Sequence, residues 1–434
     1  MTRILITTFG SSGDLNPFIA LGLGLRARGH DVVYAVEDTF EPVLTAAGFT
    51  TAHHLSGNVN TLLQRYTPEI YRSGLPFTST DIIIGKYVVP TLPAKIEELR
   101  AACAGVDLMV APSQHFAASA VSELTGIPLA TVNLSPVSFP SAHLVPHPLP
   151  IPLPGPLRRL ANRAQWGVGE MVLRSIADKP INSIRAGYGL PPRRDQLTTG
   201  NLSSRFTAIA VSPAFVRPQP DWPPQVRITG FCFWDTPNGW SESEEITAFL
   251  DGSKPVIAVS AGSTSMQIPG VFERFYRVSI EAIQCLGGRA LIIGADPGSL
   301  LYPLPEDVLS LPFAPFSQIY PRCSAVIHHG GIGTTAQALR AGVPALVVPW
   351  AFDQFFTAAQ VEQIGAGRWL WHRAYTRERV ARTLHTLLMS GSSSAARARA
   401  VAHGIAQEDG VGTLCEALES CYEQSLSHAG ESHG

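Results

Sequence analysis

Two segments of the chain carry residues whose types and spacing could hold or transfer a charged group. The first contains Gly10, Gly13 and Asp14, directly after a short apolar run. The glycines permit a tight turn, and Asn16 and Pro17 favour the start of a helix. Because open α/β sheets bind ligands at the carboxyl ends of their strands, Asp14 is a candidate general base. The alternative interpretation is charge complementation at the helix N-terminus.

The second segment is richer in groups that bind phosphate. An apolar run at residues 325–328 is followed by His329, Gly331 and Gly333, and then by a helical pattern that includes Thr334. Glycines let a diphosphate approach the backbone, and the amides of a helix N-terminus point toward it. The imidazole and the hydroxyl add further donors. These residues predict a diphosphate site.

Neighbouring loops supply what a sugar nucleotide would need beside its diphosphate. Asp353 and Gln354 follow another apolar run, and a carboxylate next to an amide can bond several sugar hydroxyls. Ser263 and Thr264 suit further diphosphate contacts. Phe313 is assigned to the nucleobase, with core packing as its alternative. We therefore expect a nucleotide-diphosphate site with a sugar clamp.

The site is predicted to use no metal and no cofactor, with the nucleotide sugar as co-substrate. The sequence has no Asp-x-Asp pair, no CxxC and no His/Cys spacing typical of zinc. The helix dipole and its donors would then stabilise a departing diphosphate. The six cysteines show no paired spacing and are interpreted as reduced thiols.

Composition excludes several classes of protein. The 434 residues are 45% hydrophobic and 15% charged, which excludes a disordered chain. Lys and Arg total 32 against 34 Asp and Glu, so the chain lacks the excess of basic residues that would indicate a nucleic-acid partner. No apolar run reaches the roughly 18 residues of a membrane span, and the start lacks a signal peptide. These features predict a cytoplasmic protein.

Short apolar runs alternate with helical patterns along the chain, which predicts an α/β fold with two Rossmann-like, doubly wound parallel sheets. We expect an acceptor domain at 1–220, a donor domain at 221–410 and a C-terminal helix with a frayed tail at 411–434, the helix packing back on the first domain. The proline-rich segment 217–224 is interpreted as the linker. The expected strands are 3–8, 31–36, 106–111, 127–133, 208–211, 255–260, 289–294, 325–328, 344–348 and 369–371.

A second proline-rich segment, 136–156, holds eight prolines and is predicted to be an extended surface loop. It forms either a rigid connection or the wall of an apolar acceptor pocket, to which Phe139, Leu144 and the more distant Ile83 are assigned. The following stretch, 155–176, places three arginines beside apolar residues. A solvated helix face and contact with an anionic membrane surface at the inner face of the membrane both stay open.

At this point the motifs resemble a known family. Residues 328–341, with 349–354, resemble the donor-binding signature of family 1 glycosyltransferases of the GT-B fold, and the similarity covers nearly the whole sequence. Shorter stretches are more narrowly similar to the rhamnosyltransferase of rhamnolipid synthesis, and more distantly to sterol, macrolide and glycopeptide glycosyltransferases. These stretches are 133–136, 141–144, 221–223, 229–231 and 262–264.

The resemblance implies two domains that face a cleft, and inverting transfer of a sugar without a metal. His329 matches the histidine that contacts the donor diphosphate, and Asp353 with Gln354 matches the pair on the sugar hydroxyls. Gly331, Gly333 and Thr334 follow as backbone and hydroxyl contacts. Asp14 stands where plant relatives have a histidine base.

Three positions depart from the family pattern. Plant enzymes orient their histidine with an aspartate, whereas this protein has His115 in that region, which leaves His115 as a helper on the acceptor side. Gln337 replaces the glutamate that many UDP-sugar enzymes place on the ribose. That change is compatible with a deoxyribose donor, and UDP-glucose also stays open. His329 stands where the rhamnolipid enzyme has a proline.

The predicted function is transfer of a sugar from dTDP-rhamnose or UDP-glucose to a hydroxyl of a lipophilic acceptor. A hydroxy-fatty acid, a polyketide, a sterol and a phenolic compound all fit the apolar loops of the first half. A nucleotide-sugar epimerase and a donor-binding partner subunit without its own activity are the alternatives. The oligomeric state stays open.

Overall fold

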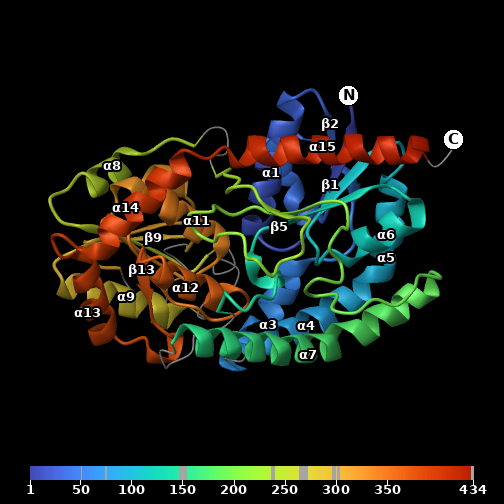
Figure 1. Ribbon diagram of the computed structural model, residues 1–434. Helices are drawn as coiled ribbons and strands as arrows, with labels where there is room; N and C mark the ends of the chain where they lie inside the picture. Colours follow the sequence, from blue (N-terminus) through green and yellow to red (C-terminus); the bar gives the residue numbers. More distant parts are fainter. Residues whose placement is uncertain are drawn as a thin grey trace. The chain divides into compact units, whose positions relative to one another are not determined.

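The computed structural model describes residues 1–49, 51–73, 76–145, 154–235, 240–262, 272–295, 300 and 304–431. The chain forms two compact units. The N-terminal unit comprises Met1–Leu62, Leu75–Trp234 and Asp409–Gly434, and the C-terminal unit comprises Leu63–Gly74 and Asp235–Glu408. Each unit is built around one parallel sheet with helices packed against it (Figure 1). Among the described residues, no helix combines the length and apolarity needed to cross a membrane.

The sheet of the N-terminal unit has seven parallel strands in the order β3-β2-β1-β4-β5-β6-β7. The strands are β1 (Arg3–Thr7), β2 (Asp31–Val36), β3 (Thr51–His54), β4 (Leu108–Ala111), β5 (Leu129–Asn133), β6 (Thr207–Ile209) and β7 (Val226–Ile228). The α-helices are α1 (Ser12–Ala27), α2 (Glu41–Ala46), α4 (Pro76–Ile83), α5 (Val89–Ala102), α6 (Phe116–Thr125), α7 (Gly155–Gly187) and α15 (Gly410–Glu431), and α3 (Val59–Ser73) begins in this unit and continues from Leu63 in the other. Short turns of 3₁₀-helix lie at Asp38–Phe40 and Pro136–Ser138, and a π-helical turn, η2, spans Ile84–Val88.

The C-terminal unit has six parallel strands in the order β10-β9-β8-β11-β12-β13. They are β8 (Val256–Ser260), β9 (Arg289–Ile293), β10 (Val308–Leu311), β11 (Ala325–His328), β12 (Ala345–Val347) and β13 (Gly367–Trp369). The α-helices are α8 (Glu244–Leu250), α9 (Glu273–Cys285), α10 (Phe316–Ile319), α11 (Ile332–Ala341), α12 (Gln354–Gln363), α13 (Arg377–Leu388) and α14 (Ser393–Ala406). Two 3₁₀ turns lie at Tyr320–Arg322 and His372–Ala374.

Both sheets have the doubly wound order, in which the chain runs outward from a central strand in one direction and then in the other. The order reverses between β1 and β4 in the first sheet, and between β8 and β11 in the second. The central strands β4, β8 and β11 are buried along their whole length. Such runs need apolar residues at every position because helices cover both faces of the sheet. The predicted fold of two Rossmann-like units is confirmed.

The last helix belongs to the first unit. Leu414, Cys415 and Leu418 of α15 are buried in the core that α1 and β1 share, and Figure 1 shows α15, in red, beside α1. Arg28 forms two hydrogen bonds with Glu419 of α15, at 3.0 and 2.9 Å. The chain therefore returns to its N-terminal unit after completing the C-terminal one.

The division between the units falls at Trp234, later than the boundary predicted at residue 220. The proline-rich segment 217–224 is not a free linker. Asp221 accepts hydrogen bonds from Ser141 Oγ and Ala142 N at 2.7 and 2.8 Å, and the buried Trp222 donates to the Phe139 carbonyl. The strand β7 then adds to the edge of the first sheet. Proline content alone does not distinguish a linker from a segment held by side-chain contacts.

The segment 136–156 also departs in part from the predicted extended loop. Pro136–Ser138 forms a 3₁₀ turn, and α7 begins at Gly155 with Pro156 in its first turn, where a missing amide donor costs no helix hydrogen bond. Residues 146–153 lie outside the described part of the chain.

Candidate functional site

The glycine-rich turn follows β11 at the carboxyl edge of the second sheet, beside the reversal of strand order. Gly330 has φ +94°, a conformation that favours glycine, and Gly331 is the N-cap of α11. The first amides of α11 have no carbonyl partner within the helix and carry its positive dipole. An anion is therefore favoured at this turn.

His329 is held between two glycines of adjacent loops. A Cβ atom added at Gly262, after β8, or at Gly331 would overlap its ring. Its Nδ1 atom is buried and has no hydrogen-bond partner in the described structure. Burial lowers the pKa of His329 to about 4, so the ring is neutral at pH 7. A neutral imidazole donates from one nitrogen and accepts at the other, so Nδ1 can bond a ligand oxygen when it carries the ring proton.

His328 is a residue that the sequence analysis did not assign to the site. Its Nδ1 accepts a hydrogen bond from Gly330 N at 3.1 Å, so it fixes the glycine turn from within. This requires an unprotonated Nδ1, and burial lowers the pKa of His328 to about 3. The only sequence signal was its place at the end of an apolar strand.

The first two turns of α11 carry the other predicted donor-site residues. Gly333 and Thr334 lie in the first turn, where Thr334 is buried. Thr335 bonds back to the Gly331 carbonyl at 2.9 Å and so serves the helix itself. Gln337 is also buried, and its Oε1 has no partner in the described structure. Like His329 Nδ1, it is a buried polar atom that a ligand could satisfy, and His328 Nε2 is also buried without a partner in the described structure.

The loop between β12 and α12 brings the predicted sugar clamp to the same edge of the sheet. Gln354 Oε1 accepts hydrogen bonds from the amides of Trp350 and Ala351 at 2.9 and 3.1 Å, which fixes the loop around it. Asp353 is the N-cap of α12. Phe352, just before it, has φ +56°, which is uncommon for a bulky residue and typical of functional loops.

Of the three remaining predicted donor-site residues, Phe313 lies in a different loop, and Ser263 and Thr264 are not among the described residues. Phe313 lies in the loop after β10, with 51% of its side chain exposed, so its ring is free to stack rather than held in the core. Ser263 and Thr264 lie outside the described residues, and their assignment stays a prediction.

Asp14 lies at the start of α1, at the carboxyl edge of the first sheet. Its Oδ2 accepts hydrogen bonds from Ser11 N and Ser11 Oγ at 2.7 and 3.0 Å, so it closes a capping box. A Cβ at Gly10 would overlap this carboxylate, and Gly10 has φ +122°. Burial raises the pKa of Asp14 above its ordinary 3.8, against the lowering by the Ser11 bonds. Asp14 can cap the helix and also accept a proton, because both of its hydrogen bonds from Ser11 go to the same oxygen, Oδ2.

His115 lies across the strand reversal from Asp14, after β4. Its Nδ1 accepts from Ala118 N at 3.3 Å, so Nε2 carries the proton and donates to Thr7 Oγ1 at 3.1 Å. Burial lowers the pKa of His115 to about 3, with a further lowering by Lys95. A ring that is neutral and bonded at both nitrogens orients the loops and does not exchange a proton near pH 7.

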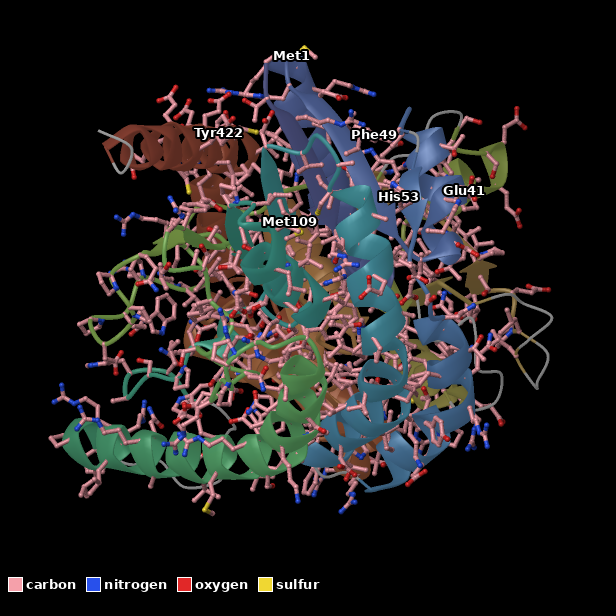
Figure 2. All side chains as sticks on the ribbon, turned by 90° about the vertical axis from the view of Figure 1, so that its right-hand side faces the viewer. Met1, Glu41, Phe49, His53, Met109 and Tyr422 are labelled. Carbon is pink, nitrogen blue, oxygen red and sulfur yellow. The ribbon has the colours of Figure 1, made fainter. Side chains whose placement is uncertain are left out.

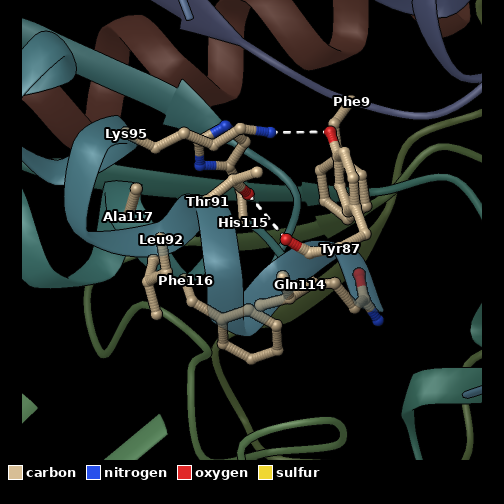
Figure 3. A pocket seen from close by; sticks show the side chains of 10 residues that line it. Phe9, Tyr87, Thr91, Leu92, Lys95, Gln114, His115, Phe116 and Ala117 are labelled. Atoms are coloured by element: carbon tan, nitrogen blue, oxygen red, sulfur yellow. Dashed lines mark hydrogen bonds between the residues drawn. The ribbon is translucent and has the colours of Figure 1, made fainter. Parts of the chain in front are cut away.

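A small cavity of about 20 Å³, with room for a group the size of one water, lies beside His115 (Figure 3). Lys95 Nζ donates to Tyr87 OH at 2.6 Å and to Glu37 Oε1 at 2.9 Å. Phe9, which precedes the Asp14 turn, packs against Tyr87 and against the edge of His115. The sequence analysis missed this buried ion pair because its members lie far apart in the chain. The one signal was a carboxylate directly after the apolar strand β2.

The other predicted acceptor residues do not meet at this cavity. Ile83 is partly buried at the end of α4, just before the π-helical turn that presents Tyr87. Phe139 is completely buried and packs on Trp222, with ring centroids 5.7 Å apart. Leu144 is buried, and its carbonyl accepts from Trp166. Among the described residues, no group of three or more His, Cys, Asp or Glu side chains could hold a metal ion.

Comparisons with known proteins place this geometry in a family. The family model of the erythromycin biosynthesis protein CIII-like C-terminal domain matches residues 288–412. The O-mycaminosyltylonolide 6-deoxyallosyltransferase of Streptomyces fradiae is 32% identical, over 97% of this chain and 98% of its own length.

Two solved structures share the fold. The spinosyn forosaminyltransferase SpnP has a TM-score of 0.69 at 19% identity, covering 97% of this chain and 99% of its own. The spinosyn rhamnosyltransferase SpnG complexed with thymidine diphosphate has a TM-score of 0.64 at 20% identity, covering 96% and 100%. Given a relative of this identity along its full length, the chain belongs to the family 1 glycosyltransferases of the GT-B fold.

Proposed function

We propose that this glycosyltransferase moves a deoxyhexose from a dTDP donor to a hydroxyl of a lipophilic polyketide-like acceptor, with inversion at the anomeric carbon. The observation that carries the donor half is that His329 Nδ1, in the turn before α11, and Gln337 Oε1, on α11, are buried without partners in the described structure. A nucleoside diphosphate supplies phosphate oxygens and a sugar hydroxyl, which would satisfy both.

The choice of dTDP rests on Gln337 and on the relatives. An amide in place of a carboxylate weakens the contact to a ribose diol, which a deoxyribose lacks in part. The Streptomyces fradiae relative is named as a 6-deoxyallosyltransferase, and the SpnG structure holds thymidine diphosphate. UDP-glucose is the competing donor, and hydroxy-fatty acids, sterols and phenolic compounds are the competing acceptors.

In the proposed reaction Asp14 accepts the proton of the acceptor hydroxyl as that oxygen attacks the anomeric carbon and the bond to the diphosphate breaks. Its raised pKa makes it a stronger base than an exposed aspartate. The departing diphosphate is held by the α11 amides, by Thr334 and by the neutral His329. His115 keeps the loop that precedes Asp14 in place. No metal takes part in the proposal.

The decisive experiment pairs dTDP-rhamnose or UDP-glucose with a macrolide aglycone, a hydroxyacyl lipid and a phenol, and identifies products by mass spectrometry. We expect a deoxyhexose on the macrolide, from the dTDP donor alone and at an unchanged rate in EDTA. A hexose added from UDP-glucose would overturn the donor assignment. A free sugar released without acceptor would indicate epimerase-like or hydrolytic chemistry instead.

A substitution at Gln337 isolates the donor choice. Gln337→Glu should lower the Kd for UDP relative to the Kd for dTDP, because the carboxylate accepts from both ribose hydroxyls. Gln318→Glu, at an exposed position of α10 in the same unit, adds the same charge and should leave the ratio unchanged. An unchanged ratio in both variants would remove Gln337 from the donor site.

A further inference from the structure

The first half of α7 exposes large apolar side chains that an ordinary surface helix would bury. Four large apolar side chains on this helix are exposed, by 54% for Leu157, 65% for Leu160, 57% for Val168 and 61% for Met171. Ala164 between them is exposed as well. We call these five residues the α7 strip. A surface helix normally turns such residues toward the core.

The five residues of the strip share one face of the helix. At 3.6 residues per turn they fall within an arc of roughly 80°, and they extend over about 21 Å of the helix axis. Figure 2 shows side chains extending outward from α7, the green helix at the bottom. The strip is therefore continuous and linear, unlike apolar residues scattered singly over a surface.

Contacts on the opposite side fix the direction in which the strip points. Asn162 is buried, and its Nδ2 donates to the Ala142 carbonyl at 3.0 Å. Trp166 is buried one turn later, and its Nε1 donates to the Leu144 carbonyl at 3.2 Å. Turning the strip inward would break both bonds and expose the tryptophan. The helix is thus held with its apolar side outward.

The charges beside the strip select the partner. The span of the strip, residues 157–171, contains Arg158, Arg159 and Arg163 and a single acidic residue, Glu170, which interacts with Arg174 and Thr198 of the protein itself. All three arginines are exposed, and none forms an ion pair with a described residue. Two of them lie near the positive end of the helix dipole, so their position does not stabilise the helix. An anionic partner would compensate this charge.

We propose that the α7 strip, flanked by Arg158 and Arg163, forms a docking surface for an anionic lipid membrane. The helix lies in the plane of the interface, with its apolar side chains among the acyl chains and its guanidinium groups at the lipid phosphates. The other possible partner is a second copy of the protein, which the test below distinguishes by its oligomeric state. The proposal stands independently of the donor and acceptor proposed above.

The test is co-sedimentation of the full-length protein with vesicles of pure phosphatidylcholine and with vesicles rich in phosphatidylglycerol. We expect binding to the anionic vesicles that weakens with added salt. Each of Arg158→Gln and Arg163→Gln should lower the partition constant about fivefold, from about 1 kcal/mol per cation near an anionic surface. Equal binding to both vesicles, or no binding, would overturn the proposal.

Matched variants distinguish the strip from general stickiness. Met171→Ser should weaken binding, whereas Met389→Ser, at a side chain of the C-terminal unit that is 54% exposed, should not. Arg382→Gln, at an exposed position of α13, is the control for charge. All the substituted side chains are exposed, so circular dichroism and turnover of a water-soluble acceptor should stay unchanged. Equal losses from Met171→Ser and Met389→Ser would contradict the proposal, as would a dimer in sedimentation velocity that Met171→Ser dissociates.

Discussion

In both sheets the strand order reverses at the centre, and the two sheets differ in whether the titratable side chains at their carboxyl edges are hydrogen-bonded within the protein. In the N-terminal unit charged and titratable side chains find partners within the protein: Lys95 bonds Glu37 and Tyr87, and His115 is bonded at both nitrogens. In the C-terminal unit the donor turn leaves His329 Nδ1 and Gln337 Oε1 buried without partners in the described structure. The described titratable side chains of the first edge are thus bonded within the protein, whereas a titratable ring of the donor turn, His329, keeps one buried nitrogen without a partner in the described structure.

The physical reason lies in what each edge must do. For Asp14, the proposed base, the two Ser11 bonds fix the position of the carboxylate, and burial raises its pKa against the lowering by those bonds. A site for a diphosphate needs neutral donors that lose little by desolvation before the ligand arrives. Unpartnered buried atoms at the first edge, Thr8 Oγ1 and Asn133 Nδ2, are also neutral. They are candidates to bond an oxygen of the acceptor.

Asp14→Asn should have the largest effect and would separate the two edges. Turnover should fall by about 10²- to 10⁴-fold, because the amide cannot accept the proton. The Kd for dTDP should not change, since asparagine still accepts from Ser11 and the proposed nucleotide site lies in the other unit. The measurements are steady-state kinetics and calorimetric titration, with Asp38→Asn as an exposed control in the same unit. A large loss of dTDP affinity would contradict the role of Asp14 as base.

Lys95→Met tests the pairing of buried charges at the first edge. Removing the lysine leaves Glu37 buried without its cation, and we expect a loss of about 3–5 kcal/mol in the free energy of unfolding. The double variant Lys95→Met with Glu37→Leu should lose much less, because no unpaired charge remains. Urea denaturation of all three proteins measures both. If the two variants were equally destabilised, the cost would come from packing and not from charge.

Gly331→Ala tests the second edge through geometry alone. The backbone at Gly331, with φ −59°, accepts alanine without strain, but the new Cβ would overlap the His329 ring. Displacement of the ring should weaken dTDP binding about tenfold, or about 1.4 kcal/mol. Gly187→Ala has open space around its Cβ and serves as the control. Unchanged affinity in Gly331→Ala would show that His329 does not contact the nucleotide.

Acid should lower turnover through Asp14 and raise nucleotide-sugar affinity through His329. Near neutral pH both changes should be smaller than the effect of any substitution above. Acid should lower turnover as Asp14 protonates, from a pH above that of an ordinary aspartate because its pKa is raised. The pKa of His329 is about 4, so at pH 7–8 the ring is neutral and affinity for a nucleotide sugar should be flat. Further acidification protonates the ring beside the diphosphate and should raise affinity. If acid lowered both affinity and turnover, a single titrating group would account for both, and the separate role of His329 would be contradicted.

Much of the donor edge was predictable because its residues are adjacent in the chain. The run from His329 to Thr334 and the pair Asp353 and Gln354 lie on single turns after buried strands, so the local pattern and the parallel sheet place them together. The acceptor edge was not predictable in this way. Lys95, Glu37 and Tyr87 come from different elements, and no local pattern connects them. Phe139 was assigned to a pocket wall from its apolar type, and the structure uses it as packing for Trp222.

The sequence by itself determined the two doubly wound sheets, their buried central strands and the turns that end in Asp14 and His329. Long apolar runs and glycine turns are local properties, and they suffice for these elements. Only the tertiary structure decided the edges. The strands β3, β7 and β10 lie at sheet edges, were missed by the sequence analysis, and exist because a neighbour pairs with their backbone. In the same way the α7 strip faces outward because contacts distant in sequence hold the opposite side of its helix, whereas the return of α15 to the first unit was already expected from the sequence.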